Sequence, residues 1–378
     1  MKKRGFVLFS SVLLGDVVSV FFSVFNTLIE MRMFVIVLFS LLFISCANES
    51  RELNIIPIHP NLVDSINISD VIGEVRYITL DSHDSIPVIG NITKLVVENG
   101  TIYISDSRAL HSFSLEGKHL NTICKYGRGP GEYLGISDFC LGEEKVHILD
   151  NNGLLYTYTH QGEYLKSVKP DFYTASISTL PDNKLLLTSA YQSDADKLHI
   201  YDSESLQRSA SFAPIKRSEM TWRHIKGQEN FFRAGEELLY HEQMNDTVYS
   251  ITNNLMEPKY VFVFEGKNAP QNFWEREYSS IMDIVMKLNA EGYAFGTPTF
   301  AEKDNKIILT YRVGSDAKLC LYYKNSKESV QTKNIYFEAL GVSVPFDECR
   351  YSFRDSRSLA IAIDLGDNII LCFDNNAI

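Results

Sequence analysis

The sequence predicts an all-β protein, a six-bladed β-propeller built from four-stranded antiparallel blades. The main observation is a hairpin pattern, in which a turn rich in Asn, Asp, Gly or Glu leads into a strand of about five residues. Other plausible strands flank each copy, so the repeat is near forty residues, which is typical of propellers. The 23 Phe and 20 Tyr residues also favour pleated sheets. The six copies are "NGTIYISD" (99–106), "EEKVHILD" (143–150), "DNKLLLTS" (182–189), "GEELLYHE" (235–242), "DNKIILTY" (304–311) and "GDNIILCF" (366–373).

A propeller has to be closed into a ring, and the segment "EVRYITLD" (74–81) is the candidate for this role. It precedes the first full blade and has no hairpin of its own, so we expect it to form the outer strand of the last blade. The chain ends at Ile378, just after the expected second strand of blade six, which leaves one strand missing. Either the segment around "LNIIPIHP" supplies that strand or the chain is truncated.

Extra sequence is concentrated in long connectors between blades, at about 215–230, 265–296 and 338–358. Each joins an outer strand to the next inner strand, and such connectors share one face of the disc with the turns between second and third strands. We therefore expect a single functional face, because loops on a rigid scaffold are where binding is normally placed. Within the second insertion, 272–296 is expected to be a helix, capped by Asn272 and ended by Gly292. Its apolar stripe consists of Trp274, Tyr278, Ile281, Val285 and Leu288.

The first 45 residues are expected to be an export signal region. After "MRM", the apolar run "FVIVLFSLLFI" has the length of a signal-peptide h-region and is too short to span a bilayer. The following "LFISC" resembles a bacterial lipobox, in which Ser45 and Cys46 match while Phe43 departs from the usual aliphatic residue. Cys46 would then carry lipid and anchor the chain to a membrane. Residues 46–71 would link it to the propeller at 72–378.

Two alternatives remain for this N-terminal region. Translation could start at Met31, which would make the first 30 residues an artefact. Residues 6–29 could instead form a transmembrane helix, although Asp16 makes this less favourable. Cys46 would in that case be an ordinary core cysteine.

Charge and cysteine spacing exclude some classes of site. The net charge of −11 and the scattered Lys and Arg residues argue against a general nucleic-acid binder, which needs a basic face. The cysteines other than Cys46 show no C-x-x-C spacing, so neither zinc nor thioredoxin chemistry is supported, and we expect buried thiols. They are Cys124, Cys140, Cys320, Cys349 and Cys372.

Four features together resemble a known family: the lipobox, the "RYITLD" segment, the loop "GRGPGEY" (127–133) and the "DNKL" type of hairpin. They are similar to the six-bladed β-propeller lipoproteins of anaerobic gut bacteria, which look related to NHL-repeat propellers. The resemblance covers about residues 46–378, and the glycine-rich loop is its most specific element. It implies a propeller anchored in the cell envelope, with a biochemical role that is largely unassigned.

The loop "GRGPGEY" is expected to connect blades one and two and to lie on the functional face. It has neither G-K-[ST] nor a following helix, so it is not a P-loop. Arg128 and Glu132 could pair with each other or face a ligand. Trp222, Arg223 and His224 in the first insertion mix aromatic and cationic groups suited to sugar or carboxylate contacts. The candidate ligand-binding residues are Arg108, Arg128, Glu132, Tyr133, Trp222, Arg223 and His224.

Acidic residues recur in the turns between second and third strands, whose inner ends would surround the mouth of the channel. Oxygen ligands suit Ca²⁺, so these turns are a candidate metal site. The alternative is that Asp and Asn form turns by bonding their own backbone, and their repetition in every blade favours this interpretation. The candidate metal ligands are Asp106, Asp150, Asp246, Asp316 and Asp374.

No catalytic set can be assigned from this sequence, so a binding or scaffolding role is expected over an enzymatic one. The chain is predicted to be a lipid-anchored envelope protein that binds a glycan, a peptide or a partner protein. The outer membrane is favoured as its location, and the outer face of the inner membrane is the alternative. The alternative is a metal-dependent hydrolase or lyase with its site at the channel mouth.

Overall fold

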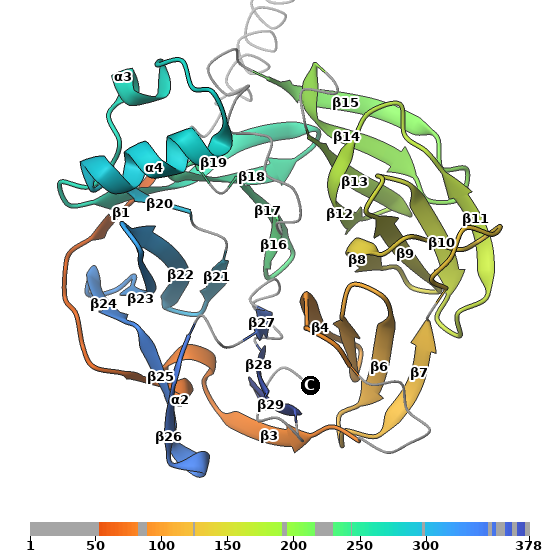
Figure 1. Cartoon of the computed structure of the whole chain (residues 1–378), viewed down its shortest axis with the longest axis horizontal. Coiled ribbons are helices and arrows are strands. Elements are labelled where there is room, and N and C mark those ends of the chain that lie inside the picture. Colours follow the sequence, from red (N-terminus) through yellow and green to blue (C-terminus); the bar gives the residue numbers. More distant parts are fainter. Residues whose placement is uncertain are drawn as a thin grey trace, which may run out of the picture. The chain divides into compact units, whose positions relative to one another are not determined.

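The computed structural model describes residues 53–81, 89–123, 125–190, 195–215, 230–242, 244–296, 299–346, 350–352, 360–364 and 369–374. The chain divides into the units Met1–Glu52 and Leu53–Ile378, and every described residue belongs to the second. In that unit, six mainly antiparallel sheets stand in a ring (Figure 1). The predicted six-bladed β-propeller is therefore confirmed.

The first three blades each have four strands in chain order. Blade 1 consists of β4 (Lys94–Glu98), β5 (Thr101–Ser105), β6 (Leu110–Ser114) and β7 (His119–Ile123). Blade 2 consists of β8 (Ile136–Leu141), β9 (Lys145–Asp150), β10 (Leu155–Thr159) and β11 (Tyr164–Val168). Blade 3 consists of β12 (Thr174–Leu180), β13 (Lys184–Ser189), β14 (Asp196–Asp202) and β15 (Arg208–Pro214).

The other three blades include strands from elsewhere in the chain. Blade 4 consists of β16 (Phe231–Ala234), β17 (Glu237–His241), β18 (Thr247–Thr252), β19 (Leu255–Phe264) and the N-terminal β1 (Asn54–Ile58). Blade 5 consists of β21 (Phe300–Lys303), β22 (Lys306–Val313), β23 (Asp316–Tyr323) and β24 (Glu328–Thr332), with β20 (Ala294–Phe295) also on β22. Blade 6 consists of β27 (Arg350–Ser352), β28 (Ala360–Asp364), β29 (Ile369–Asp374) and β3 (Val75–Thr79).

Hydrophobic clusters lie between successive blades, because each sheet has an apolar face that it cannot cover alone. Tyr133, for example, packs with Ile123 of blade 1 and Phe139 of blade 2. Ile78 of β3 packs with Ile102 of blade 1, so the closing strand also joins the last blade to the first. The core of the propeller is thus divided into interblade layers.

Ring closure follows the prediction in one part and departs from it in another. β3 pairs antiparallel with β29, as expected for "EVRYITLD", with Ile78 opposite Leu371. The expectation that the last blade lacks one strand is wrong, because "GDNIILCF" contains the third strand of its blade and not the second. β27 and β28 supply the first two strands. A turn followed by a strand has the same local pattern at either position, so the sequence could not distinguish them.

The segment "LNIIPIHP" has a different role from the one considered for it. β1 pairs in parallel with β19 and forms the outermost strand of blade 4, with Ile56 opposite Phe262. Farther along, β2 (Ile66–Asn67) pairs with β25 (Asn334–Phe337), which also pairs with β26 (Val342–Pro345). α2 (Ile68–Ile72) then leads into β3. The N-terminal segment thereby contacts blades 4, 5 and 6.

The other helices in the described part of the chain are short. They are α3 (Gln271–Trp274), α4 (Ile281–Glu291) and the 3₁₀ helix η3 (Glu338–Leu340). Within the ranges described above, no helix is long and apolar enough to cross a membrane. The expected buried thiols are confirmed for Cys140 and Cys320, while the side chains of Cys124, Cys349 and Cys372 lie outside the description.

Candidate functional site

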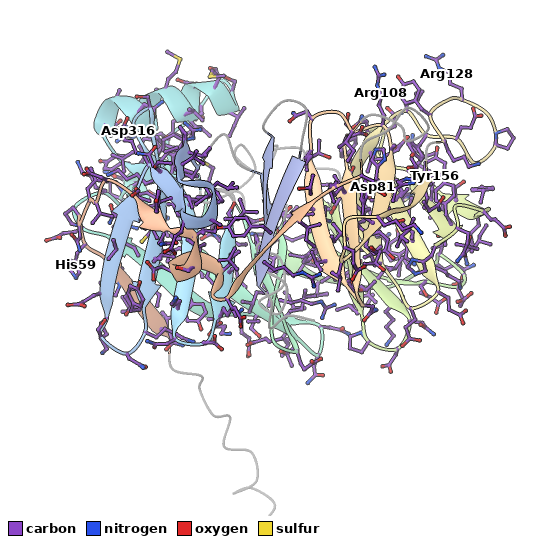
Figure 2. The ribbon with its side chains drawn as sticks, turned by 90° about the horizontal axis from the view of Figure 1, so that it is seen from below. His59, Asp81, Arg108, Arg128, Tyr156 and Asp316 are labelled. Carbon is purple, nitrogen blue, oxygen red and sulfur yellow. The ribbon has the colours of Figure 1, made fainter. Side chains whose placement is uncertain are left out.

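The insertion face of the propeller is the side that carries the connectors between blades and the turns between second and third strands. In an antiparallel blade these two kinds of loop emerge on the same side. Figure 2 shows Arg108, Arg128 and Asp316 on the side where the cyan helix α4 lies. The loop "GRGPGEY" and the second insertion therefore share this face.

The loop "GRGPGEY" is held closed by its own hydrogen bonds. The Gly127 N–H donates to the Tyr133 carbonyl (3.0 Å), and the Tyr133 N–H donates to the Lys125 carbonyl (2.8 Å). The Glu132 carboxylate accepts a hydrogen bond from the Gly129 N–H (2.7 Å). Glu132 is thus engaged with the loop backbone, and no ion pair with Arg128 is present among the described residues. These contacts give the loop a structural role as a connector.

Tyr133 is fully buried between blades 1 and 2. Its hydroxyl donates to the Ile123 carbonyl (2.9 Å), and its ring meets those of Tyr156 and Tyr158 edge-on at 6.1 Å and 6.3 Å between centroids. The Tyr158 hydroxyl in turn donates to the Gly131 carbonyl (2.9 Å). The expectation that Tyr133 contacts a ligand at the surface is therefore corrected, because its side chain is enclosed in the core.

An exposed group of three side chains remains at the surface of this region: Arg108, Tyr126 and Arg128, called here the Arg–Tyr group. The Arg108 guanidinium carbon lies 5.8 Å from the centre of the Tyr126 ring. Tyr126 is 57% exposed. Arg128 forms no ion pair or side-chain hydrogen bond with another residue in the described part of the chain. All three side chains are exposed.

Asp106 at the end of β5 holds its own turn together. Its carboxylate accepts hydrogen bonds from the N–H groups of Gly90 (2.9 Å), Arg108 (3.0 Å) and Ala109 (2.8 Å). Nε2 of the buried His111 ring lies 3.5 Å from Oδ2 of Asp106. Burial by itself would raise the pKa of Asp106, but the adjacent His111 ring and the hydrogen bonds from these backbone groups outweigh it and hold the pKa well below its ordinary value. The turn-forming interpretation fits this residue.

Asp150 and Asp316 are also engaged locally. Asp150 accepts hydrogen bonds from the N–H groups of Asn152 (2.8 Å) and Leu154 (2.9 Å), as a turn-forming aspartate does. Asp316 forms an exposed ion pair with Lys333 at 3.0 Å. Neither carboxylate is directed by these contacts toward a shared centre.

The other two candidate metal ligands are separated by topology. Asp246 follows β17 on the insertion face and accepts a hydrogen bond from the Asn268 amide (2.6 Å). Asp374 ends β29, which is a third strand, so its backbone lies on the face of the disc opposite the insertion face, and its side chain lies outside the description. Placing Asp374 in a second-to-third turn was therefore wrong. In the parts of the chain that are described, no three His, Cys, Asp or Glu side chains group closely enough to hold a metal ion.

Asp246 provides a test of the local electrostatics. Burial, only partly offset by the Asn268 hydrogen bond, raises the pKa of Asp246 to about 6. A raised folded-state pKa means that stability from this group is fully present below about pH 4 and is lost as the pH rises toward 6. A rise of about two pKa units corresponds to a loss on the order of 2 kcal/mol between pH 4 and pH 7.

The matched variant for this prediction is Asp246→Asn, which cannot titrate but can still accept from Asn268. Equilibrium unfolding of both proteins at pH 4 and pH 7 would measure the effect. The stability of the native protein relative to the variant should fall between the two pH values. A constant difference would show that Asp246 does not titrate in this range.

The second insertion contains two helices and not the predicted single one. α4 begins after Ser280, whose hydroxyl accepts from the Asp283 N–H (3.2 Å), so Asn272 is not the cap. It ends at Gly292, as predicted, with φ +72°. Ile284 and Leu288 are buried against Phe273 of α3. The apolar spacing persisted across both helices because both pack on this cluster, and spacing alone did not reveal the break.

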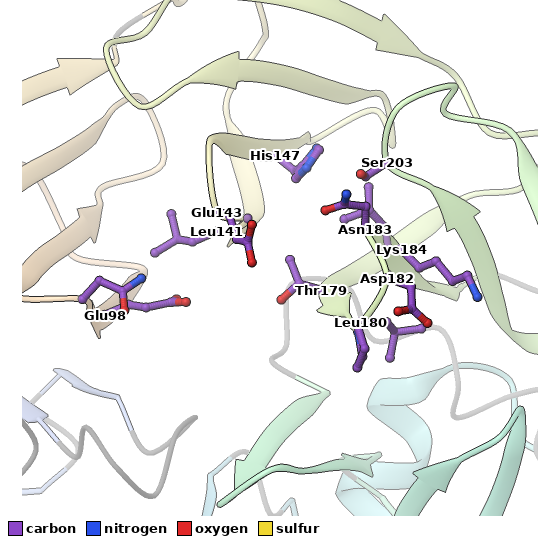
Figure 3. A pocket seen from close by; sticks show the side chains of 14 residues that line it. Glu98, Leu141, Glu143, His147, Thr179, Leu180, Asp182, Asn183, Lys184 and Ser203 are labelled. Atoms are coloured by element: carbon purple, nitrogen blue, oxygen red, sulfur yellow. The ribbon is translucent and has the colours of Figure 1, made fainter.

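A pocket that the sequence did not indicate lies on the other face, called here the turn face. Its volume is about 360 Å³, and it is lined by turns between the first and second strands of blades 1, 2 and 3 (Figure 3). Glu98 and Glu143 come from the first two of these turns and Asp182 from the third. Turn residues read one blade at a time give no sign that three turns meet around one space.

Several candidates fall outside the description. Trp222, Arg223 and His224 lie in the undescribed part of the first insertion, so their grouping stays a prediction. The same holds for lipidation of Cys46 and for the export region.

Solved structures share this fold at low sequence identity. A Bacteroides fragilis protein that is assumed to be exported has 18% identity and a TM-score of 0.66, over 85% of this chain and 99% of that one. The extracellular domain of an assumed one-component system of B. thetaiotaomicron has 12% identity and a TM-score of 0.36, over 68% of this chain and 29% of that one. The Neurospora crassa Pan2 WD40 domain has 10% identity and a TM-score of 0.45, over 84% of this chain and 99% of that one. The first match supports the fold, and the other two score too low for further argument.

Comparison with protein families carries more weight for this chain. No curated protein matches the sequence. One family model matches residues 53–354, which is most of the chain and nearly all of the described propeller. The chain therefore belongs to the family described as a domain of unknown function, DUF4934.

Proposed function

We propose that this chain is an exported, lipid-anchored binding module whose insertion face docks a partner protein through that partner's carboxylate groups. The observation that carries the proposal is the Arg–Tyr group. Arginine presents a planar fork of donors that matches a carboxylate, and Arg and Tyr are enriched among residues that dominate binding energy. In a chain of net charge −11, two exposed arginines and Lys125 beside them form a local site for an anionic group.

The helix α4 favours a protein partner over a glycan. Its outward residues Met282 and Met286 are 62% and 64% exposed, one helical turn apart. Figure 2 shows α4 on the same side as Arg108 and Arg128. Flexible methionine side chains are common at surfaces that adapt to proteins. The insertion face thus offers an apolar contact and a cationic contact.

The placement in the cell envelope is supported by the sequence. The lipobox ending at Cys46 and the apolar run before it support export and lipid anchoring. The likeness to lipoprotein propellers supports the outer membrane as the site of the anchor.

Charge reversal on the Arg–Tyr group tests the proposed docking. We expect a fluorescent tetraglutamate peptide to bind the native protein more tightly than its tetraglutamine counterpart. The double variant Arg108→Glu and Arg128→Glu should weaken tetraglutamate binding by about tenfold or more, as expected for lost hot-spot contacts. Fluorescence anisotropy at fixed ionic strength would measure both dissociation constants.

The matched control is Lys118→Glu, which reverses an exposed charge in the turn between β6 and β7 on the opposite face of blade 1. It should leave the affinity unchanged. The control changes the net charge by half as much as the double variant does, so a loss in the control of half the size or more on a logarithmic scale would show that only the overall charge matters. Equal binding of the tetraglutamine peptide would remove carboxylate recognition altogether.

A further inference from the structure

We propose that the pocket on the turn face binds an alkylammonium or alkylguanidinium group, such as the end of a lysine or arginine side chain or of a free polyamine. The site is separate from the Arg–Tyr group and lies on the opposite face. The proposal therefore goes beyond the proposed function and does not depend on it. The volume of the pocket is about 360 Å³, at the lower end of the range for ligand sites, which suits a ligand as small as the end of one side chain.

Carboxylates dominate the charge of the pocket. Figure 3 shows the side chains of Glu98 and Glu143 reaching from neighbouring turns toward the same space. Asp182 adds a third carboxylate, and Lys184 is the sole lining lysine or arginine. In Figure 3 the Lys184 side chain extends away from the two glutamates. A cationic ligand would provide these carboxylates with a counter-charge.

Two of these carboxylates have no protein partner among the described residues. Neither Glu143 nor Asp182 forms an ion pair or side-chain hydrogen bond with any residue in the described part of the chain. Both side chains are exposed, so a ligand in the pocket can reach them.

His147 provides a polar group at the buried side of the pocket. The residue is only 2% exposed, and its Nδ1 lies 3.1 Å from the Thr157 hydroxyl. Its Nε2 forms no hydrogen bond with a described residue. Burial, with Lys145 and Lys166 nearby, lowers the pKa of His147 to about 4, so the ring is neutral at pH 7. When Thr157 accepts from Nδ1–H, Nε2 can accept a hydrogen bond from a ligand N–H.

Apolar side chains in the pocket can contact the alkyl part of such a ligand. Leu141, Leu180 and Leu185 line the pocket together with Pro181. An alkyl chain can pack on such a surface while its charged end meets carboxylates, as lysine and arginine stems do in proteins. The combination is therefore better suited to an alkyl cation than to an inorganic ion or an anion.

Isothermal titration of the purified full-length chain tests this proposal with named probes. Cadaverine represents a free amine, Nα-acetyl-lysine amide and Nα-acetyl-arginine amide represent peptide side chains, and 1,5-pentanediol is the neutral control. We expect saturable binding of the cations and none of the diol. Cadaverine binding better than the peptide analogues would identify free amines as the source of the cation, and the reverse order would identify peptides.

Charge removal within the pocket gives the matched comparison. Glu143→Gln should weaken cation binding by about tenfold, whereas Glu144→Gln, one residue along the same turn and outside the lining, should not. Glu98→Gln provides a second pocket variant should the first fail to fold. Equal affinity for the diol, equal losses in the Glu143 and Glu144 variants, or no cation binding at millimolar concentration would overturn the proposal.

The two proposals can fail separately. The Arg108→Glu and Arg128→Glu double variant should bind cadaverine as the native protein does. Glu143→Gln should retain the native affinity for tetraglutamate. Loss of both activities in one variant would indicate misfolding, which thermal unfolding of that variant would reveal.

Discussion

Replacing Asp138 by alanine is expected to lower the free energy of unfolding by about 3–5 kcal/mol, because it leaves a buried ammonium group without its counter-charge. Asp138 on β8 is 5% exposed and Lys94 on β4 is 7% exposed, and the two form an ion pair. The same carboxylate accepts from the Ser176 hydroxyl (2.7 Å) and the Ile177 N–H (2.8 Å) of β12. One side chain therefore joins the inner strands of blades 1, 2 and 3.

Urea unfolding of the variant and of a matched surface variant would measure this effect. Asp171 pairs with Arg208 at 2.6 Å, but its side chain is 63% exposed, so Asp171→Ala should cost less than about 1 kcal/mol. With Lys94→Met already present, the effect of Asp138→Ala should shrink by about 2 kcal/mol, because the two positions are coupled. Similar effects in the Asp138 and Asp171 variants would contradict the burial argument.

Tyr133→Ala is expected to destabilise the protein by about 3–5 kcal/mol, the range for removing a large aromatic side chain from a core. The side chain is fully enclosed, contacts two other tyrosine rings and bonds the Ile123 carbonyl. Tyr133→Phe keeps the ring and loses only the hydroxyl, so it should cost about 1 kcal/mol. Chemical denaturation of both variants would separate the packing contribution from the hydrogen bond.

Tyr126 provides the control on the same loop. It is 57% exposed, so Tyr126→Ala should change stability by less than about 0.5 kcal/mol. Under the proposed function it should still weaken tetraglutamate binding, because it supports Arg108. If Tyr126→Ala destabilised the fold as much as Tyr133→Ala, the loop would not divide into a buried connector and an exposed contact.

The sequence by itself was sufficient for the repeating part of the fold. Five of the six hairpin copies contain the second strand of their blade, in β5, β9, β13, β17 and β22. Turns such as Asn99-Gly100, where both residues have positive φ, follow from local residue chemistry. The closing strand β3 was also predictable, because an isolated strand before the first blade has few other places to pair.

Pairing between distant segments was decided only by the tertiary structure. Nothing local to "NIIPI" indicates that it lies parallel to β19. The two strands are far apart in the chain, since Asn54 and Lys259 are separated by 205 positions. The position of "GDNIILCF" within its blade was misjudged for the same reason, since a hairpin motif does not state how many strands precede it. Strand neighbours are set by which apolar faces bury each other, and that depends on the whole ring.

The candidate sites divide along the same line. The sequence predicted the face on which the second insertion lies and the alternative role of aspartates as turn formers, which Asp106 and Asp150 show in their backbone contacts. It did not predict that Tyr133 is enclosed, because an aromatic residue in a glycine-rich loop has the same local pattern whether buried or exposed. The pocket was also beyond its reach, because Glu98, Glu143 and Asp182 belong to separate hairpins. Residue chemistry and turn geometry are local properties, whereas burial and the meeting of side chains from three blades exist only after the ring has closed.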